Sequence, residues 1–592
     1  MKKSFLLLVS SFLLSMSSAF AADITIGTPG GAGGVEVNGI WAKGSNVIIN
    51  DHVIIPVGGS LTIEEGVNVQ IADTTLKIEF IVLGNFYAKG TKENPISISV
   101  KSDMVPANVP SARPFPGFWG SILCDTTCSE FLMLYTNIKY YGAATSDNSP
   151  SVLLHLYKNA SGETEPYINF RNHNNGKLVI EHCTFSNGMD DGIYIEGGNV
   201  IYAYNVLYQN GYTGGDATNF KAGSIADCAF NFYYSPNTNA FKLSNSGSRS
   251  PQANILVYNN TIVNAGWRRP TVKGGGIWYE AAVVAKSFNN LQINNRFGIK
   301  SDGKADAASD ADYNYYYGYG QNVVNNFTSV KGLFKQGAHD ILGASAGDKD
   351  PLLVNYPLNT DTMNSAYDQS WDFRLQANSP AVGKGTNSFV RHFGTTGITI
   401  GGVEYKSPEP STTIGAFGQV IAVTGITISD KTASLKVGET KTLSASVAPD
   451  NADVLTYSFG SIDASIATVD QNGVVTGVKE GTTKIYATTA GFGDTCVVTV
   501  TAATAIINVN KDNFSVYPNP VKSELFVQFG NTSKQSTILV YSVLGEVVML
   551  KNINGSSDNN TVSLSVENLK DGLYFISLQN AGQKITKSFV KK

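Results

Sequence analysis

Short stretches in which apolar and polar residues alternate run along the chain from residue 22 to about residue 418. Residues 60–63 and 66–69 show this alternation, and residues 95–98 repeat it after a turn. A period of two is the pattern of a β-strand with one buried face. Because helical periodicity is hard to find after the amino-terminal apolar run, the pattern predicts an all-β region of many short strands.

A repeat is visible within this region. Five tripeptides begin with Cys or Asn and place an apolar residue two positions later; they start at Cys183, Asn205, Cys228, Asn260 and Asn289. Repeats of roughly 20 to 50 residues are the signature of a solenoid. We predict that these five side chains point inward in one column. Stacked asparagine amides would then pass hydrogen bonds from coil to coil and satisfy their buried polar groups.

A second strand of each coil shows the same phase. Its first residue is apolar and should face inward, so its second residue should face outward. Parallel strands lie about 4.8 Å apart, so the second residues are predicted to form an outward ladder along the axis. The pairs are Ile193-Tyr194, Phe220-Lys221, Phe241-Lys242, Ile277-Trp278 and Ile299-Lys300.

This ladder is the sharpest candidate for chemistry. Its three ammonium groups would meet carboxylates or sulfates of an anionic polysaccharide, and the rings of Tyr194 and Trp278 would stack on sugars. The corner loops nearby carry Arg249, the pair Arg268-Arg269 and Lys273. The alternative is that all of these are ordinary solvated side chains on an exposed sheet.

Acidic residues bracket the strand that bears Tyr194. Asp190, Asp191 and Asp216 are candidate calcium ligands, since calcium takes carboxylate oxygens. Asp190 and Asp191 with Glu196 could instead act as an acid–base pair. The alternative is plain turn chemistry, because Asp before Gly192 is common in turns.

Cysteine and histidine add little chemistry. Cys124 and Cys128 are close enough in sequence to pair across a loop, whereas Cys183, Cys228 and Cys496 are predicted to be buried apolar residues. If Cys183 points inward, strand alternation sends its neighbour His182 outward, which argues against a nucleophilic pair.

Length and charge bound the function further. A chain of 592 residues is too long for one ordinary domain, and its net charge of −4 favours neither a nucleic-acid partner nor an acidic tail. Lys2 and Lys3 precede an apolar run over residues 5–16 and an Ala-Phe-Ala site at 19–21, which predicts a signal peptide over residues 1–21. No later stretch approaches the roughly 20 apolar residues of a spanning helix.

Two segments after residue 418 resemble known domains. Residues 422–501 resemble a bacterial immunoglobulin-like group 2 domain (BIG2) through the motifs at 435–440 and 473–477, with Tyr457 or Phe459 in place of the usual core Trp. Residues 512–592 begin with Val-Tyr-Pro-Asn-Pro, end in Phe-Val-Lys-Lys, and resemble the type A sorting domain of the Bacteroidetes type IX secretion system. This resemblance implies recognition by the type IX machinery and export to the cell surface or the medium.

Residues 22–418 resemble secreted right-handed parallel β-helix proteins with a pectate-lyase-like scaffold, and the run 372–383 resembles their last coil. Many such proteins are polysaccharide lyases, in which calcium or a basic residue neutralises a uronate and a Lys or Arg removes the C5 proton. The resemblance implies catalytic roles for Lys221, Lys242 and Arg249, and substrate contacts for Tyr194, Trp278, Lys300, Arg268 and Arg269. It extends to the scaffold alone, and fold does not fix function.

Two functions therefore stay open. The first is a carbohydrate-active enzyme on an acidic polysaccharide, a lyase before a glycoside hydrolase. The second is a non-catalytic surface adhesin or glycan-binding protein with the immunoglobulin-like domain as a spacer. The expected fold class is the same for both: a right-handed parallel β-helix, then an immunoglobulin-like β-sandwich and a small carboxy-terminal β-sandwich.

Overall fold

The computed structural model describes residues 23–31, 33–105, 117–156, 160–212, 214–269, 271, 273–329, 334–361, 366–450, 452–502, 514–530, 536–553, 560–580 and 583–592. The predicted signal peptide lies outside the described residues. The chain divides into two units, Met1–Ala422 and Val423–Lys592.

The first unit is a β-solenoid with three parallel sheets, here named A, B and C. A full coil of the chain adds one strand to each sheet. Sheet A contains β1 (Asp23–Ile26), β4 (Asn46–Ile49), β7 (Asn68–Ile71), β10 (Ile96–Val100), β13 (Thr136–Lys139), β16 (Thr184–Gly188), β19 (Val206–Asn210), β22 (Phe232–Tyr234), β25 (Thr261–Val263), β28 (Leu291–Ile293), β31 (Tyr315–Tyr317) and β32 (Ile341–Leu342). Sheet B contains β2 (Val35–Glu36), β5 (Val53–Ile55), β8 (Phe80–Val82), β11 (Ile122–Cys124), β14 (Ile168–Phe170), β17 (Ile193–Ile195), β20 (Thr218–Phe220), β23 (Asn239–Ser244), β26 (Gly275–Glu280) and β29 (Ile299–Ser301). Sheet C contains β3 (Gly39–Trp41), β6 (Ser60–Glu64), β9 (Asn85–Lys89), β12 (Glu130–Leu134), β15 (Lys177–Glu181), β18 (Gly198–Ala203), β21 (Ser224–Ala229), β24 (Asn254–Tyr258), β27 (Val284–Phe288) and β30 (Asp310–Asp312).

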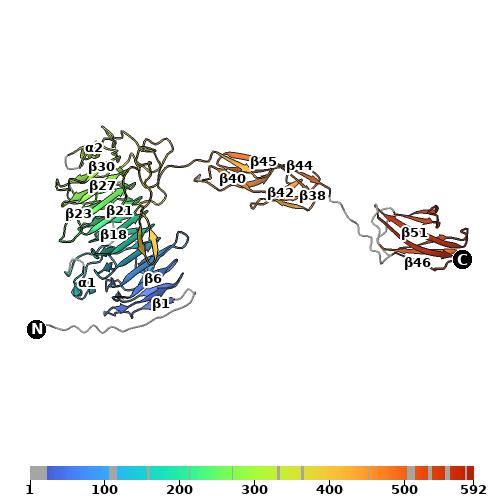
Figure 1. Ribbon diagram of the computed structural model, residues 1–592, viewed down its shortest axis with the longest axis horizontal. Coiled ribbons are helices and arrows are strands. Elements are labelled where there is room, and N and C mark those ends of the chain that lie inside the picture. The colour runs from blue at the N-terminus through green and yellow to red at the C-terminus, as the bar shows by residue number, and fades with distance from the viewer. Residues whose placement is uncertain are drawn as a thin grey trace. The chain divides into compact units, whose positions relative to one another are not determined.

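Strand alternation explains why the coils stack. Figure 1 shows β6, β18, β21, β27 and β30 of sheet C one above another in chain order. Every second residue of each strand faces one shared core, so apolar side chains form columns along the axis. One column of sheet A consists of Val47, Val69, Ile98, Ile138, Phe185, Leu207, Tyr233 and Ile262. The predicted all-β solenoid is confirmed.

A buried asparagine ladder joins five successive coils at the corner between sheets C and A. Each side-chain amide donates to the Oδ1 of the next asparagine at 2.9–3.0 Å, and that Oδ1 also accepts from the backbone N–H of the residue before it in the ladder at 2.8–3.1 Å. The ladder consists of Asn205, Asn231, Asn260, Asn290 and Asn314. The backbone N–H of Cys183 donates to Asn205 Oδ1 at 3.0 Å and begins it.

The ladder corrects two members of the predicted column. Cys228 is buried in the core, but it lies on β21 of sheet C, and Asn231 takes the ladder position. Asn289 is the corner residue itself, with a left-handed φ of 59°, and Asn290 takes the ladder position. The two errors are shifts of three residues and one residue, because a short motif of Cys or Asn before an apolar residue matches more than one place in a coil.

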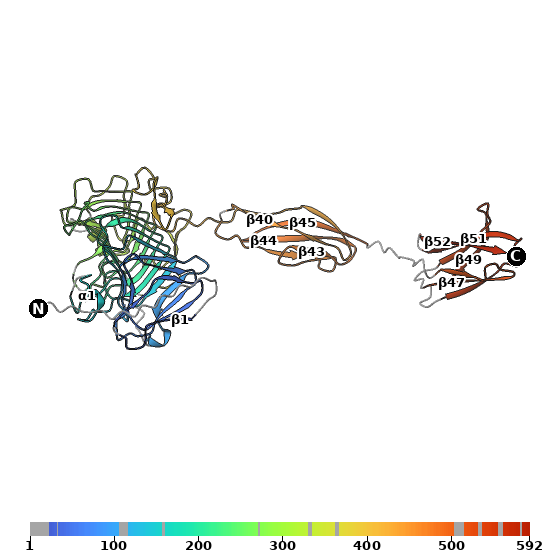
Figure 2. The ribbon, with the colours of Figure 1, turned by 60° about the horizontal axis from the view of Figure 1, so that its bottom comes forward.

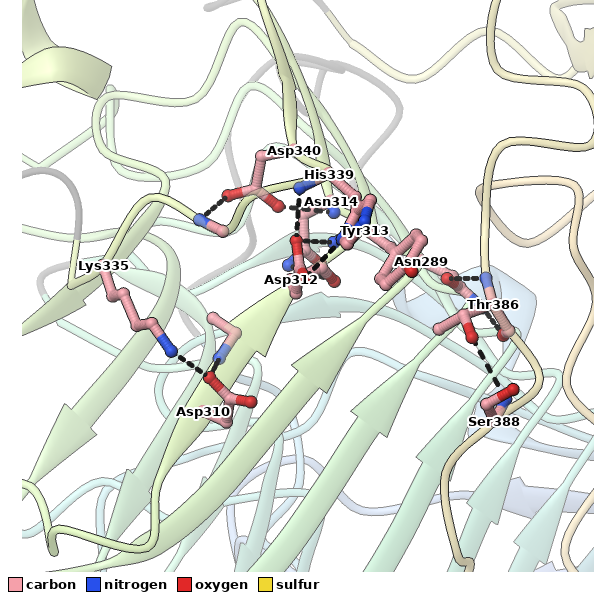
Figure 3. A network of polar contacts seen from close by, with 12 residues as sticks. Asn289, Asp310, Asp312, Tyr313, Asn314, Lys335, His339, Asp340, Thr386 and Ser388 are labelled. Atoms are coloured by element: carbon pink, nitrogen blue, oxygen red, sulfur yellow. Dashed lines mark hydrogen bonds and ion pairs between the residues drawn. The ribbon is translucent and has the colours of Figure 1, made fainter.

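A partly buried carboxylate ends the ladder. The backbone N–H of Asn314 donates to Asp340 Oδ1 at 2.8 Å, and the N–H of Gly337 donates to Oδ2 at 2.8 Å (Figure 3). Burial raises the pKa of Asp340 to about 6. The Asp340 carboxylate thus accepts the last backbone hydrogen bond of the ladder, in the final coils of the solenoid.

Residues 350–418 are not a last coil, contrary to the sequence-based expectation. They contain two antiparallel pairs, β33 (Leu353–Asn355) with β34 (Asp372–Leu375) and β35 (Ile398–Ile400) with β36 (Val403–Tyr405). Their apolar side chains cover the outer faces of sheets A and C, where Phe373 packs on Phe232 and Ile398 belongs to the cluster around Val179. Figure 3 shows Thr386 of this segment beside Asn289.

A buried aspartate fixes this returning segment to sheet C. The fully buried Asp227 carboxylate accepts from the backbone N–H groups of His392 and Phe393 at 3.2 and 2.9 Å. It also accepts from Ser407 Oγ at 2.6 Å and lies 2.7 Å from His392 Nδ1. Four polar contacts replace the water that a carboxylate loses on burial.

Two short helices complete the first unit, α1 (Pro150–Leu153) and α2 (Gln321–Thr328), with a 3₁₀ turn over Ser102–Met104. Leu156, just after α1, packs on Ile54, Ile81 and Leu123, which cover the outer face of sheet B in the early coils. Farther along, from β17 to β29, half-buried charged and aromatic side chains occupy that face.

The second unit contains two groups of sheets whose strands pair antiparallel, except for the parallel pair β38–β45 (Figure 2). The first group comprises β37 (Gly425–Ile428), β38 (Thr432–Lys436), β39 (Thr440–Thr442), β40 (Ala445–Ala448), β41 (Ser458–Ser461), β42 (Ala467–Val469), β43 (Val474–Gly477), β44 (Gly481–Thr489) and β45 (Phe492–Thr501). Phe459 is buried in its core whereas Tyr457 is largely exposed, so Phe459 replaces the missing Trp. The second group comprises β46 (Ser515–Tyr517), β47 (Glu524–Phe529), β48 (Ser536–Tyr541), β49 (Val547–Ile553), β50 (Asn560–Ser565), β51 (Gly572–Asn580) and β52 (Gln583–Lys591).

Replacing the central ladder residue should destabilise the solenoid. Asn260→Ala removes the Oδ1 that accepts from Asn231 N and Nδ2, and leaves those donors buried without partners. We expect a loss of about 3 kcal/mol or more, measured by urea unfolding of the intact chain. The matched control is Asn199→Ala on the exposed face of β18, which should change stability by less than about 0.5 kcal/mol. Equal losses for both variants would contradict a stabilising role of the ladder.

Candidate functional site

The outer face of sheet B carries the candidate site. The strand register places one outward residue of each strand in a single column along the axis. That column consists of Asn169, Tyr194, Asn219, Lys242, Trp278 and Lys300. Four of the five predicted members are therefore confirmed in their column.

Lys221 lies outside that column. It comes two residues after Asn219, which occupies the place predicted for Lys221. Phe220 pairs with Leu243 and not with Phe241, so Asn219 holds the rung beside Lys242. A shift of two residues preserves the alternation, so Lys221 still lies on the outer face, at the level of Glu196. The expected alignment of Phe220-Lys221 with Phe241-Lys242 rests on the identity of the two dipeptides. The observed register pairs Phe220 with Leu243 instead.

Trp278 is the centre of a cluster of ammonium groups. The Nζ atoms of Lys300, Lys242 and Lys273 lie 4.3, 4.8 and 5.7 Å from its ring centroid. Lys221 Nζ lies 5.4 Å from the ring centroid of Tyr194. The negative ring faces attract cations at such distances. The two rings therefore hold lysines near them, and their stacking on sugars stays a prediction.

Two of the cations are matched by carboxylates. Lys242 Nζ lies 3.5 Å from Glu280 Oε2, and Arg249 Nη1 lies 3.0 Å from Glu196 Oε2. Arg249 Nε also donates to the backbone oxygen of Ala222 at 3.0 Å. These pairs fix both side chains on the face and cancel their charge.

Two further cations have no such match. Within the described ranges, neither Lys221 nor Lys300 has a carboxylate at ion-pair distance. Only 8% of Lys221 is exposed, and burial lowers its pKa, with the positive charge of Lys242 acting in the same direction. Burial lowers the pKa of Lys300 to about 8, with Lys273 and Lys242 contributing to that lowering against Asp216. The face thus holds two desolvated amines whose nearest acidic groups, such as Asp216 and Glu280, act on them from beyond ion-pair distance.

The three aspartates predicted to bind metal form part of the fold. Asp191 Oδ1 accepts from the backbone N–H of Asp216 at 2.6 Å, and Asp216 Oδ1 accepts from Asn239 N and Nδ2 at 3.2 and 2.6 Å. Thr164 Oγ1 donates to Asp190 Oδ2 at 2.5 Å. Asp191 and Asp216 therefore pass hydrogen bonds from coil to coil at a second corner of the solenoid, as the asparagine ladder does at the first.

Burial raises the pKa of Asp191 to about 7, and the charges of Asp216 and Asp190 act in the same direction. Among the residues that the structure describes, no group of three or more His, Cys, Asp or Glu side chains is placed to hold a metal ion. Calcium binding by these aspartates stays a prediction.

The two corner arginines differ in their surroundings. Arg268 donates to the backbone oxygens of Asn210, Gly211 and Ser235 at 2.6–3.0 Å, and burial lowers its pKa to about 10. This guanidinium closes a coil corner, and its contact with a substrate stays a prediction. Arg269 is half-buried, and its Nη1 donates to Thr238 Oγ1 at 2.9 Å.

Three residues of the face escaped the sequence analysis: Asn169, Asn219 and Glu280. Glu280 lies two positions after Trp278, so strand alternation alone could have placed it on the outer face. Asn219 could have been found by counting back two positions from Lys221. The contacts of Glu280 and Asn219 depend on which residues pair between neighbouring coils. That pairing depends on the lengths of the loops, and strand alternation gives no information about them.

The thiols take no part in the site. All five cysteines are buried and free, including Cys124 and Cys128. Cys183 lies in the core, whereas His182 is exposed and stacks between Tyr135 and Tyr204 with ring centroids 4.4 and 4.7 Å apart. The expected separation of His182 from Cys183 is confirmed.

Comparison with protein families identifies two segments of the chain. Residues 422–500 match the bacterial Ig-like domain of group 2, and residues 515–592 match the secretion system C-terminal sorting domain. No helix in the described part of the chain is long and apolar enough to cross a membrane.

Individual relatives share short segments only. The chain is 51% identical over 78 residues to the 3-O-alpha-D-galactosyl-alpha-L-arabinofuranosidase of Bifidobacterium longum, which covers 12% of this chain and 7% of that enzyme. It is 42% identical over 95 residues to the lacto-N-biosidase of Bifidobacterium bifidum, covering 16% of this chain and 8% of the enzyme. It is 37% identical over 70 residues to beta-agarase A of Zobellia galactanivorans, covering 12% of each chain.

Solved structures add no argument on function. Domains 5–6 of the S-layer protein SbsC match 29% of this chain and 97% of that fragment at 13% identity, with a TM-score of 0.13. The family matches and the fold together identify the chain: it is a type IX-secreted protein, directed to the cell surface or the extracellular space, with an amino-terminal β-solenoid, a group 2 bacterial immunoglobulin-like domain and a carboxy-terminal sorting domain.

Proposed function

We propose that the outer face of sheet B, from β17 to β29, binds an anionic polysaccharide outside the cell. The observation that carries this proposal is the pair of desolvated amines, Lys221 and Lys300, without carboxylate partners. Buried charges in proteins are normally paired, because losing water is costly. Carboxylates or sulfates of a ligand would supply the missing counter-charges.

The spacing of these amines favours a polymer over a small anion. Lys221 follows β20 and Lys300 lies on β29, three strands farther along the sheet. At about 4.8 Å per strand, the two positions are about 14 Å apart along the axis. One ligand reaches both amines only if it is extended and carries repeated negative groups. The carbohydrate-active names of the three relatives support a glycan context for the chain.

A second candidate function is β-elimination on the bound polysaccharide, favoured by the lowered pKa values of Lys221 and Lys300. A neutral amine takes the C5 proton of a uronate, the C–H electron pair forms a C4=C5 double bond, and the C4–O bond breaks. The leaving oxygen takes a proton from solvent. Lys242 and Arg249, although paired with Glu280 and Glu196, would then donate hydrogen bonds to the uronate carboxylate, with or without calcium. Without this step, the protein is a surface adhesin that binds the same glycan.

Removing the unmatched amines should weaken binding to alginate, pectate or a sulfated polymer. We expect Lys221→Ala with Lys300→Ala to lower the affinity by about tenfold or more at low salt, measured by isothermal titration. The difference should shrink as salt rises, since ions screen exposed charges. Lys286→Ala is the matched control, because it removes an exposed lysine from β27 of sheet C. An equal loss in the control variant would sink the proposed location of the site.

Binding should also depend on pH. Because the pKa of Lys300 is lowered to about 8, its charge is present below that pH and is lost above it. The affinity for the polyanion should therefore fall as pH rises through about 8. Lys300→Arg should abolish that fall, since a guanidinium stays charged over this range. The same titration curve for wild type and Lys300→Arg would rule out Lys300 as the titrating group.

Elimination predicts a product that binding alone does not. Wild-type protein should raise the ultraviolet absorbance of pectate or alginate as unsaturated ends form, and Lys300→Ala should abolish the rise if Lys300 is the base. The measurement is repeated with a chelator present, which tests the predicted calcium. Tight binding with no absorbance change on any acidic glycan would exclude the lyase and leave the adhesin.

A further inference from the structure

The sorting domain exposes an apolar surface on a sheet whose other face is already buried. In the sheet β49-β48-β51-β52, the inward residues of β48 and β51 lie in the domain core; they are Ile538, Val540, Ile576 and Leu578. On the opposite face, the register places Tyr541 between Val547 and Phe575, and Leu539 beside Leu550. The exposed fractions of Val547, Leu550 and Phe575 are 53%, 59% and 38%.

This apolar surface occupies only one half of the outer face. At the other end of the same strands the outward residues are polar, with Thr537 between Asn552 and Gln579. Leu573 on β51 and Leu544 in the turn before β49 extend the apolar half, at 43% and 84% exposure. We call this set the apolar half-face; it consists of Leu539, Tyr541, Leu544, Val547, Leu550, Leu573 and Phe575. Exposed apolar patches of this kind mark interaction sites.

A lysine lies at the edge of the apolar half-face, and the domain carries net positive charge. Residues 515–592 contain eight lysines and five acidic residues, an excess of three positive charges in a chain whose net charge is −4. Lys584 lies at the edge of the half-face, with its Nζ 4.4 Å from the ring centroid of Tyr541. A complementary partner would present an apolar surface with an acidic rim.

We infer that the apolar half-face is the surface by which this chain docks on a component of the type IX export machinery. The family match gives the domain a sorting role, and the half-face is a surface on it that suits recognition. A second copy of the chain would bring together two domains that each carry an excess of three positive charges, which like-charge repulsion disfavours. The inference rests on the sorting domain and not on the glycan proposal, so either can fail alone.

Export of the full chain in a type IX-competent host tests the inference. We expect Leu550→Ser with Phe575→Ser to reduce the protein at the surface and in the medium by about tenfold, with periplasmic retention, since loss of interface anchors weakens docking strongly. Deletion of residues 512–592 sets the level of complete retention. The matched control, Asn552→Ser with Gln579→Ser, changes the polar half of the same face and should leave export unchanged.

A second variant separates docking from folding. Lys584→Glu reverses an exposed rim charge and should lower export while the domain stays as resistant to proteolysis as the wild type. Normal export of both the apolar and the charge variant would overturn the inference. Sedimentation of the purified full chain gives the remaining test. A wild-type dimer that Leu550→Ser with Phe575→Ser abolishes, with export intact, would assign the half-face to a second copy and also overturn it.

Discussion

The asparagine ladder is the interaction on which the rest of the solenoid depends. A buried amide must find both donor and acceptor partners, and each ladder residue finds most of its partners in the coils above and below. The hydrogen bonds therefore allow one register between neighbouring coils at that corner. Core packing alone is less strict, since apolar side chains tolerate sliding more readily than paired amides do. Once the corner is fixed, the alignment of the strands of sheets A, B and C follows in the coils that the ladder joins.

That same constraint explains which parts of the fold could be predicted. Alternation along a strand reports inside and outside, so the burial of Phe185 and Cys183 and the exposure of His182 followed from the sequence. The axial order of side chains depends instead on the loops between strands. A one-residue error placed Asn289 in the ladder in place of Asn290, whereas a two-residue error left Lys221 on the correct face but in the wrong column.

The candidate site shows the same division. Lys242, Trp278 and Lys300 could be grouped from the sequence. In each of their strands, β23, β26 and β29, an inward apolar residue comes directly before the outward residue. Arg268 could not be assigned, because only the folded corner brings three carbonyl oxygens around its guanidinium. The carboxylate partners were also out of reach: Glu280 meets Lys242 across neighbouring strands, so its role depends on register.

Under the proposed function, the pairing of some cations and not others would give the face its selectivity for a polyanion. A surface on which every lysine was free would attract any polyanion, whereas Glu280 and Glu196 cancel the charges of Lys242 and Arg249 and leave positive charge at separated positions. Trp278 and Tyr194 hold the remaining amines near their rings, which lowers the cost of keeping a cation partly out of water. Because these groups project from a rigid parallel sheet, a ligand pays little to order them. Recognition then depends on the match between the spacing of its anionic groups and the spacing of the coils.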